Sequence, residues 1–266
     1  MTPMTAAGGL SGNVPSIVAP RPAVPRRPAR YGQAQEPAAI FTDQSGLASC
    51  WAEGRPVLPD LTPARRRTLA RKRILDVVLA GFGLLLLAPF LAAIALAIKL
   101  SSRGPAIFGQ VRIGEAGRPF RMYKFRTMRQ DDCDPHGQDT PSLGDRRITA
   151  IGRVLRRTSL DELPQLLNVL RGDMSLVGPR PHVRSQKAGG LRYGRLVPYY
   201  AIRQSVRPGM TGWAQANGYR GSTADPLRAR LRIDHDVAYI QNLSVLLDLR
   251  ILILTIWREF LTGSGR

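Results

Sequence analysis

The chain of 266 residues is long enough for one or two domains and one sizeable hydrophobic core. Its 39 lysines and arginines outnumber its 19 acidic residues, and the net charge of +20 favours polyanionic partners: nucleic acid, anionic lipid or phosphorylated substrates. Only two cysteines occur, Cys50 and Cys133, so a disulfide framework and a cysteine-based zinc site are excluded and a reducing compartment is expected.

The first segment, residues 1–63, is rich in proline, alanine and glycine and has few periodic apolar positions. The string RPAVPRRPAR within it is typical of a basic disordered arm, because such a composition buries too little apolar surface to offset the entropy of folding. We therefore predict a disordered, cytoplasmic N-terminal tail.

A dense basic run over 65–73 precedes an apolar segment, 77–98, that contains no charged residue. A helix of this length would be roughly 33 Å long, enough to cross the core of a bilayer. Pro89 lies in the middle and should kink such a helix, and both flanks are basic, which favours the cytoplasm for both ends. A kinked helix that crosses the membrane and a re-entrant helix that bends at Pro89 and returns to the same side both remain open.

The next segment has the pattern of a β-hairpin, with strands over 107–113 and 120–125 joined by the turn 114–117. Lys124 and Arg126 alternate with apolar residues, so on a strand they would share one face. On the pattern alone, an ordinary solvated strand face is favoured over a binding surface.

The loop over 129–147 carries several aspartates, but their spacing fits no calcium loop, and we expect a solvated loop. The histidines, His136, His182 and His235, are too scattered for a predictable metal site and are expected to be structural.

The most informative stretch is 158–181, TSLDELPQLLNVLRGDMSLVGPRP, which opens with the adjacent carboxylates Asp161 and Glu162. The arginines that flank the pair, a combination suited to chemistry on phosphates, are Arg156, Arg157, Arg171 and Arg180. Ser159 and Glu162 also have the spacing of a helix capping box, so Glu162 could serve only to cap a helix. Near a helix N-terminus, Asp161 should be ionised and could attack phosphorus or bind Mg²⁺.

This stretch and the apolar segment 77–98 closely resemble the bacterial sugar transferase family, and the resemblance covers about residues 71–262. The family's members are monotopic phosphoglycosyl transferases that move a hexose 1-phosphate from a nucleotide sugar to polyprenyl phosphate. The resemblance implies an α+β protein with a Pro-kinked re-entrant helix, a β-hairpin and a mostly helical catalytic domain that faces the cytoplasm. It divides the chain into the arm 1–63, the basic run and membrane helix 64–100, and the catalytic domain 101–266.

Site residues follow from the same resemblance. Asp161 matches the nucleophile, and Glu162 matches a second carboxylate that handles metal or a proton, so the pair is also the expected Mg²⁺ site. The expected phosphate-binding cations are Lys124, Arg126, Arg156 and Arg180. Pro179 and Pro181 would fix the turn that presents Arg180. At the membrane kink, Ala88 stands before Pro89 where several relatives have serine.

The two downstream loops around 206–213 and 217–221 look most like those of undecaprenyl-phosphate glucose phosphotransferases. We therefore expect UDP-glucose and undecaprenyl phosphate as substrates in the bacterial inner membrane, at the start of exopolysaccharide or capsule synthesis. Galactose or an N-acetylhexosamine is the alternative sugar, a homodimer is possible, and no nucleic acid is expected. The last apolar run, 246–260, is interrupted by charges and should be a packing or interfacial helix with Trp257 at the headgroup boundary.

A function of another class also accounts for part of the sequence. A membrane-tethered basic protein that binds nucleic acid or acts as a scaffold would explain the net charge and the apolar anchor. It gives no reason for two adjacent carboxylates among arginines.

Overall fold

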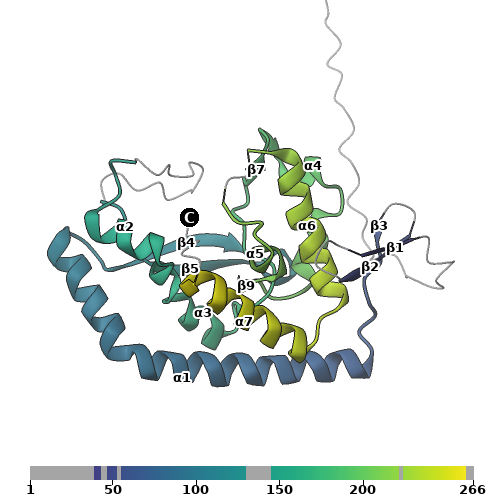
Figure 1. Cartoon of the computed structure of the whole chain (residues 1–266), viewed down its shortest axis with the longest axis horizontal. Helices are drawn as coiled ribbons and strands as arrows, with labels where there is room; N and C mark the ends of the chain where they lie inside the picture. The colour runs from purple at the N-terminus through teal and green to yellow at the C-terminus, as the bar shows by residue number, and fades with distance from the viewer. Residues whose placement is uncertain (1–38, 43–46, 53–54, 130–144, 222–223, 262–266) are drawn as a thin grey trace, which may run out of the picture. The chain divides into compact units, whose positions relative to one another are not determined.

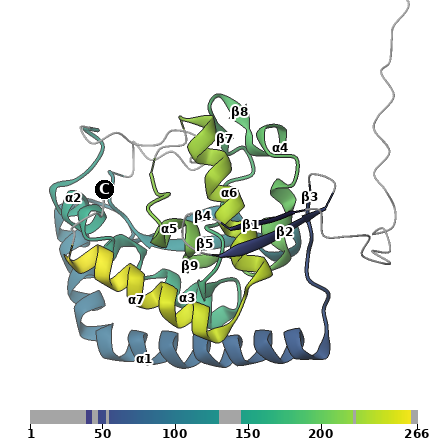
Figure 2. The same cartoon turned by 45° about the vertical axis from the view of Figure 1, so that its right-hand side comes forward.

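The computed structural model describes residues 39–42, 47–52, 55–129, 145–221 and 224–261. It has the expected α+β composition: short strands and several helices are assembled beside one long apolar helix (Figures 1 and 2). The acidic loop between 130 and 144, with His136 and Cys133, lies outside the described residues, as does the arm up to residue 38.

Helix α1, Pro63–Ser101, contains both the basic run and the apolar segment. Its start is set by Thr62, whose hydroxyl accepts a hydrogen bond from Arg65 N, and by Pro63 in the first turn, where the missing N–H costs nothing. Pro89 lies inside the helix. In both ribbon views α1 runs along one side of the fold and its C-terminal part turns toward α2 (Figures 1 and 2).

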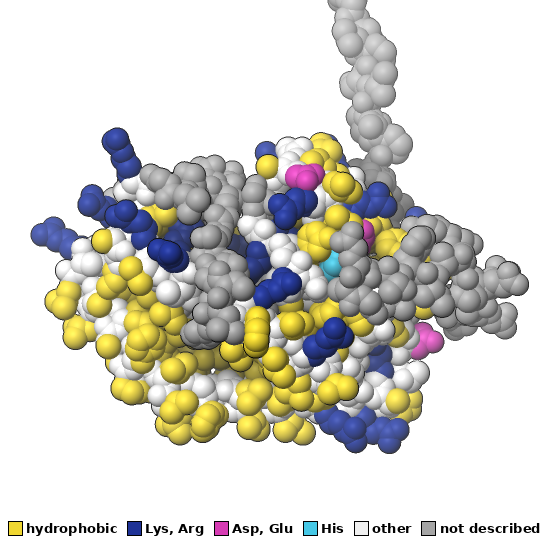
Figure 3. All heavy atoms as spheres, viewed as in Figure 1, with side chains coloured by type: hydrophobic (Ala, Val, Ile, Leu, Met, Phe, Trp, Pro, Cys, Tyr) yellow, Lys and Arg dark blue, Asp and Glu magenta, His cyan; other side chains and the backbone are white. Residues whose placement is uncertain are grey.

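Among the described residues, α1 is the one helix that is both long and apolar enough to span a membrane. Many of its large apolar side chains are exposed, and they gather along the lower edge of the molecule in Figure 3. The most exposed of them are Ile74, Leu85, Leu86 and Leu100. An apolar surface of this kind is costly in water and indicates a partner phase or partner molecule.

Two polar side chains in the first half of α1 are buried and attach the helix to the rest of the fold. The Lys72 ammonium donates to Asp248 of α7 (Val245–Leu261) at 2.6 Å and to the carbonyl of Val177 at 2.8 Å. Asp76 accepts hydrogen bonds from the hydroxyl of Ser175 at 2.8 Å and from the amide of Leu176 at 2.9 Å. These three partner residues, 175–177, are strand β6 (Ser175–Val177), so α1 holds β6 directly.

Strands β4 (Ile107–Ile113) and β5 (Pro119–Phe125) pair antiparallel from Ile107–Phe125 to Ile113–Pro119. The 3-10 turn η1, Glu115–Gly117, joins them. Strand β6 pairs in parallel with β9 (Gly209–Thr211), so the segments that follow these two strands leave the same end of the pair. Strands β7 (Lys187–Ala188) and β8 (Leu191–Arg192) form a further short hairpin.

The remaining helices are mostly short. They are α2 (Ala150–Arg157), η3 (Leu160–Glu162), α3 (Gln165–Arg171), α4 (Tyr193–Leu196), η4 (Tyr200–Ser205), α5 (Trp213–Ala216) and α6 (Pro226–Gln241).

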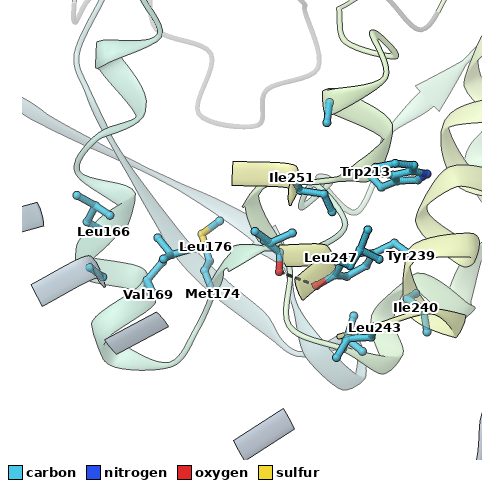
Figure 4. Close-up of a cluster of buried hydrophobic side chains, with 14 of the residues drawn as sticks. Leu166, Val169, Met174, Leu176, Trp213, Tyr239, Ile240, Leu243, Leu247 and Ile251 are labelled. Carbon is cyan, nitrogen blue, oxygen red and sulfur yellow. Dashed lines mark hydrogen bonds between the residues drawn. The ribbon is translucent and has the colours of Figure 1, made fainter. Parts of the chain in front are cut away.

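The main hydrophobic core joins α3, β6, α5, α6 and α7 (Figure 4). Trp213 and Tyr239 lie beside Leu247 and Ile251 of α7, while Val169 and Met174 come from the other side. A second cluster, Ile94 and Ile98 of α1 with Phe125 and Leu155, packs the end of the membrane helix onto β5 and α2. Helix α7 is therefore a packing helix as expected, although Leu246, Ile253 and Trp257 on it remain exposed.

The prediction of a disordered arm over 1–63 does not fit the part of that segment that the structure describes. Strands β1 (Ala39–Thr42), β2 (Ala48–Ala52) and β3 (Arg55–Pro56) form an antiparallel sheet. The amide of Gln241, at the end of α6, bonds both the N–H and the carbonyl of Cys50, and the Trp51 ring meets the Tyr199 ring edge-on at 4.9 Å. These partners are far away in the sequence, so composition alone does not indicate them.

Candidate active site

The site begins with the seating of α2 against the end of the hairpin. Thr149 caps α2 by accepting from the amide of Gly152, and its own amide donates to the carbonyl of Thr127. A Cβ at Gly152 would lie 2.1 Å from that carbonyl oxygen, so only glycine permits this close approach. As a result, the first turn of α2 is held against the segment that follows β5.

A sharp reversal then places the two carboxylates. Ser159 has a left-handed backbone (φ 55°, ψ 13°), which is uncommon for a residue other than glycine and frequent at functional sites. It starts the single turn η3, which contains Asp161 and Glu162. The alternative that Glu162 only closes a capping box is wrong: Ser159 makes no side-chain cap on η3, and the Glu162 carboxylate points elsewhere.

Glu162 is clamped between two cations from distant parts of the chain. Lys124 Nζ on β5 lies 2.7 Å from Glu162 Oε1, and Arg180 donates to Oε1 at 2.6 Å and to Oε2 at 3.2 Å. The three side chains are 21%, 35% and 15% exposed for lysine, arginine and glutamate respectively, so the cluster is sheltered but open to small ligands. A bidentate arginine fixes both the position and the plane of a carboxylate.

Arg180 is presented by the loop Gly178–Pro181 that follows β6. The Gly178 amide donates to Thr211 O, and the Gly209 amide donates to Pro179 O. A Cβ at Gly178 would lie 2.5 Å from the carbonyl of Arg207, which explains the glycine at the point where the two chains pass each other. The prolines on either side of Arg180 restrict its backbone, in keeping with the expected fixed turn.

The two adjacent carboxyl groups have opposite pKa shifts. Burial raises the pKa of Asp161 and the charge of Glu162 adds to this, so its pKa lies above the ordinary value despite Lys124 and Arg156 nearby. Burial also disfavours ionised Glu162, but the attraction of Arg180 and Lys124 is stronger and holds the pKa of Glu162 well below its usual range. Our expectation that the helix dipole and the nearby arginines keep Asp161 ionised is therefore incomplete, since burial works against both.

A match to the family described as bacterial sugar transferase covers residues 67–262. The chain belongs to the bacterial sugar transferase family. The resemblance drawn from the sequence is thereby confirmed, and the chain is a transferase. Together with the family, the long apolar helix α1 indicates membrane association.

Individual relatives agree with this placement. The transferase is 50% identical to an exopolysaccharide production protein of Rhizobium leguminosarum bv. phaseoli over 74% of this chain and 98% of that one. It is 45% identical to the UDP-glucose:undecaprenyl-phosphate glucose-1-phosphate transferase of Escherichia coli K12, over 80% of this chain and 45% of that protein. It is also 45% identical to an Aeromonas hydrophila UDP-N-acetylgalactosamine-undecaprenyl-phosphate N-acetylgalactosaminephosphotransferase, over 73% of this chain and 44% of that one. The transferase thus spans less than half of the latter two relatives.

Of the predicted phosphate-binding cations, the structure brings Lys124, Arg156 and Arg180 to the pair and places Arg126 differently. Strand β5 ends at Phe125, and the buried guanidinium of Arg126 donates to the carbonyls of Arg103 and Ser102 at 2.6 and 2.8 Å. It therefore satisfies acceptors at the end of α1, where a helix leaves its carbonyls without partners. The expected sharing of one strand face by Lys124 and Arg126 does not hold.

Two arginines that the sequence did not indicate lie in the field of the pair. Burial and the charge of Arg180 lower the pKa of Arg112 on β4 to about 10, against an opposing contribution from Glu162. Burial and the charge of Arg180 lower the pKa of Arg220, whereas the charges of Glu162 and Asp161 raise it. Arg220 lies in a loop that we had read as a family loop, whereas Arg112 had no distinguishing signal beyond its charge.

Other residues singled out in the sequence have structural roles. Arg171 lies over the Tyr123 ring and donates to its hydroxyl at 2.6 Å. The structural reading of His182 and His235 is confirmed, because Nδ1 of His182 meets the Tyr200 hydroxyl at 3.0 Å and Nδ1 of His235 meets Leu231 O at 2.8 Å.

The carboxylate pair fits the expected magnesium ion in one respect. Mg²⁺ is commonly held by one or two carboxylates together with substrate phosphates, not by a cage of protein ligands. The described residues contain no cluster of three or more His, Cys, Asp or Glu placed for a metal. Lys124 and Arg180 both bind the carboxylate of Glu162 and not that of Asp161. Oε2 of Glu162 accepts one long hydrogen bond, at 3.2 Å, so it has capacity for a further partner.

Proposed function

We propose that this transferase moves hexose 1-phosphate, with glucose as the sugar, from a UDP-hexose to undecaprenyl phosphate and releases UMP. The observation that carries the proposal is the pair Asp161–Glu162, enclosed by Lys124, Arg156 and Arg180 in a chain of the sugar transferase family. The printed activity of the Escherichia coli relative supports the choice of substrates and the glucose. The Rhizobium relative supports a role in exopolysaccharide production.

The two carboxylates take different roles because their surroundings differ. Asp161 is not held by the Lys124–Arg180 clamp, so its carboxylate is the nucleophile. One of its oxygens attacks the sugar-bearing phosphorus, the bond from that phosphorus to the UMP oxygen breaks, and an acyl-phosphate to the sugar remains on the enzyme. An oxygen of undecaprenyl phosphate then attacks the same phosphorus, and the carboxylate of Asp161 is released.

Glu162 organises the cations for both steps. Its carboxylate holds Lys124 and Arg180 at one place, where they can meet the donor diphosphate and stabilise charge that develops on the leaving phosphate. A magnesium ion held by Asp161 and Glu162 would add neutralisation of the diphosphate. Arg156, whose positive charge lowers the pKa of Asp161, adds a further cation to the site.

The acceptor is a lipid, and the fold supports delivery from the membrane. We place α1 in the bacterial inner membrane as a re-entrant helix whose bend is caused by Pro89, with the site on the cytoplasmic side. The direction change in the ribbon and the basic residues at both ends of α1 support this arrangement. A galactose or N-acetylhexosamine donor is the alternative, and the Aeromonas relative favours the N-acetylated form.

Replacement of the nucleophile tests the proposal. In membranes supplied with undecaprenyl phosphate and radiolabelled UDP-glucose, the wild type should release UMP and become covalently labelled. Asp161→Asn should lose both signals by at least about a thousandfold, because an amide cannot form the acyl-phosphate. Asp173→Asn, at the end of α3, is the matched control, since its side chain faces the amide of Asn168 and can keep that contact.

The same assay separates the alternatives. Full UMP release by Asp161→Asn would refute the nucleophile assignment. Release from UDP-galactose or a UDP-N-acetylhexosamine, with none from UDP-glucose, would keep the reaction and change the sugar.

A further inference from the structure

The loop that presents Arg180 has few hydrogen bonds of its own. Two of its four residues are prolines, which have no amide hydrogen to donate. Before Arg180, Gly178 and Pro179 bond the segment of β9 through their main chains. After it, Pro181 O accepts a long hydrogen bond from Arg112 at 3.5 Å, and the amide of Ile113 donates to His182 O at 2.9 Å. At Arg180 itself, the main-chain carbonyl is held by a side chain that comes from another element.

That side chain is Arg203 on η4. Its Nη2 donates to the carbonyl oxygen of Arg180 at 2.6 Å. The same guanidinium donates from Nε and Nη2 to Oδ2 of Asp236 at 3.1 and 2.8 Å, and it lies over the Tyr200 ring at 5.3 Å. The planar fork of arginine makes these contacts at once, which a lysine ammonium cannot reproduce.

Asp236 anchors this arrangement to the core. The Arg203 and Asp236 side chains are 4% and 3% exposed, so both charges are almost fully removed from water. Asp236 is in the middle of α6, where its neighbours Ile233 and Val237 are completely buried. A buried ion pair is weak evidence of a gain in stability, because desolvation offsets the attraction. A role other than stability is therefore the better explanation for the hydrogen bond from Arg203 to the Arg180 carbonyl.

We infer that the buried Arg203–Asp236 pair is a positioning device that holds the main chain at Arg180 so that the Arg180 guanidinium meets Glu162. The chain of contacts runs from α6 through Asp236 to Arg203, from Arg203 to the Arg180 carbonyl, and from the Arg180 side chain to the carboxylate pair. Arg203 and Asp236 are positioning residues, since they act through Arg180. The inference relies on the proposed function only for its activity readout.

The test uses the full-length protein in lipid nanodiscs and the double variant Arg203→Met/Asp236→Leu. Replacing both members of a buried pair with apolar residues of similar size avoids an unpaired buried charge and commonly preserves stability. We expect the melting temperature to stay close to that of the wild type. Covalent labelling by UDP-glucose should slow at least about tenfold, because the cation that meets Glu162 is no longer fixed. Amide exchange in the peptide covering 178–186 should become faster, while exchange in α3 stays the same.

A matched control comes from the same helix. Asp234→Asn changes a carboxylate that bonds the Tyr199 hydroxyl instead of the loop, and it should leave labelling and loop exchange at the wild-type level. If the double variant keeps both the wild-type labelling rate and the wild-type exchange in 178–186, the pair is only structural and the inference is overturned. If the wild type itself releases no UMP from any UDP-sugar, the proposed function fails, and the exchange comparison alone still decides the positioning role.

Discussion

At the scale of single residues, the site consists of two neighbouring carboxyl groups with unequal surroundings. Glu162 receives Lys124 and Arg180 directly, and their attraction holds its pKa well below the usual range. Asp161 is half-buried next to that negative charge, and its pKa is raised. Such a separation is the usual way in which two like groups obtain different tasks. Here it supports the proposed roles, charge organisation for the glutamate and nucleophilic attack for the aspartate.

The pH dependence of Asp161 can be altered through its neighbour. Glu162→Gln removes a negative charge that raises the pKa of Asp161 and leaves Lys124 and Arg180 without their anion, so that pKa should fall. Because attack requires ionised Asp161, the acid limb of the covalent-labelling rate should move to lower pH even though the maximum rate decreases. The measurement is the labelling rate between pH 4 and 8, roughly the range in which perturbed carboxyl groups titrate. An unchanged limb, or one at higher pH, would contradict the assigned coupling.

The same substitution affects stability in a pH-dependent way. The folded-state pKa of Glu162 is depressed, so its ionised form stabilises the fold above the pKa of the unfolded chain, and this contribution is lost as pH falls through the folded value. Glu162→Gln should therefore have a lower free energy of unfolding than the wild type at neutral pH. The difference between the two free energies should become smaller as the pH falls.

Part of this site could be predicted from the sequence because Asp161, Glu162 and Arg180 lie in one recognisable stretch. Lys124 was also predicted to be a site residue, from the sequence KFRTM at the end of the hairpin. Arg126 was misplaced since the sequence does not show where β5 ends or that the end of α1 needs donors. Arg112 was missed because its proximity to Arg180 and Glu162 depends on how the hairpin packs, which no local pattern encodes.

At the scale of elements, the site depends on the close passage of two segments after the parallel pair β6–β9. Gly178 and Gly209 meet there with their backbones almost in contact. Sequence periodicity identified the long helix and the hairpin, since both have extended regular patterns. It did not identify the parallel pair, whose strands are three residues each, nor the sheet β1–β3, which depends on Gln241 and Tyr199.

A single methyl group should disturb this passage. In Gly178→Ala the new Cβ would lie 2.5 Å from Arg207 O and 2.9 Å from Gly209 N, so the loop must move. A displacement of the order of 1 Å at Arg180 should lower UMP release by about a hundredfold. Gly194→Ala in α4 is the control, because its Cβ would meet nothing within 4 Å. Equal activity in the two variants would show that the loop tolerates the shift.

At the scale of the whole molecule, the proposed re-entrant arrangement places both ends of α1 on the cytoplasmic side of the membrane. Single cysteines at Ala64 and Arg103, both exposed, in a background with Cys50 and Cys133 replaced by serine, mark the two ends. If α1 is re-entrant, a membrane-impermeant maleimide should label neither site in intact spheroplasts and both after permeabilisation. Labelling of one site in intact spheroplasts would show that the helix crosses the bilayer. The cysteine-free protein controls for background labelling.

Helix α1 is more than an anchor, because Lys72 and Asp76 bind β6 and α7 from within the fold. Cutting the chain after this helix, a common way to obtain a water-soluble fragment, would strip Asp248 of its only ammonium partner among the described residues and would uncover the strand that leads to Arg180. The fragment would lose the contacts by which α1 holds β6 and α7, along with its apolar surface for lipid. Biochemical preparations should therefore retain the helix and supply detergent or lipid for it.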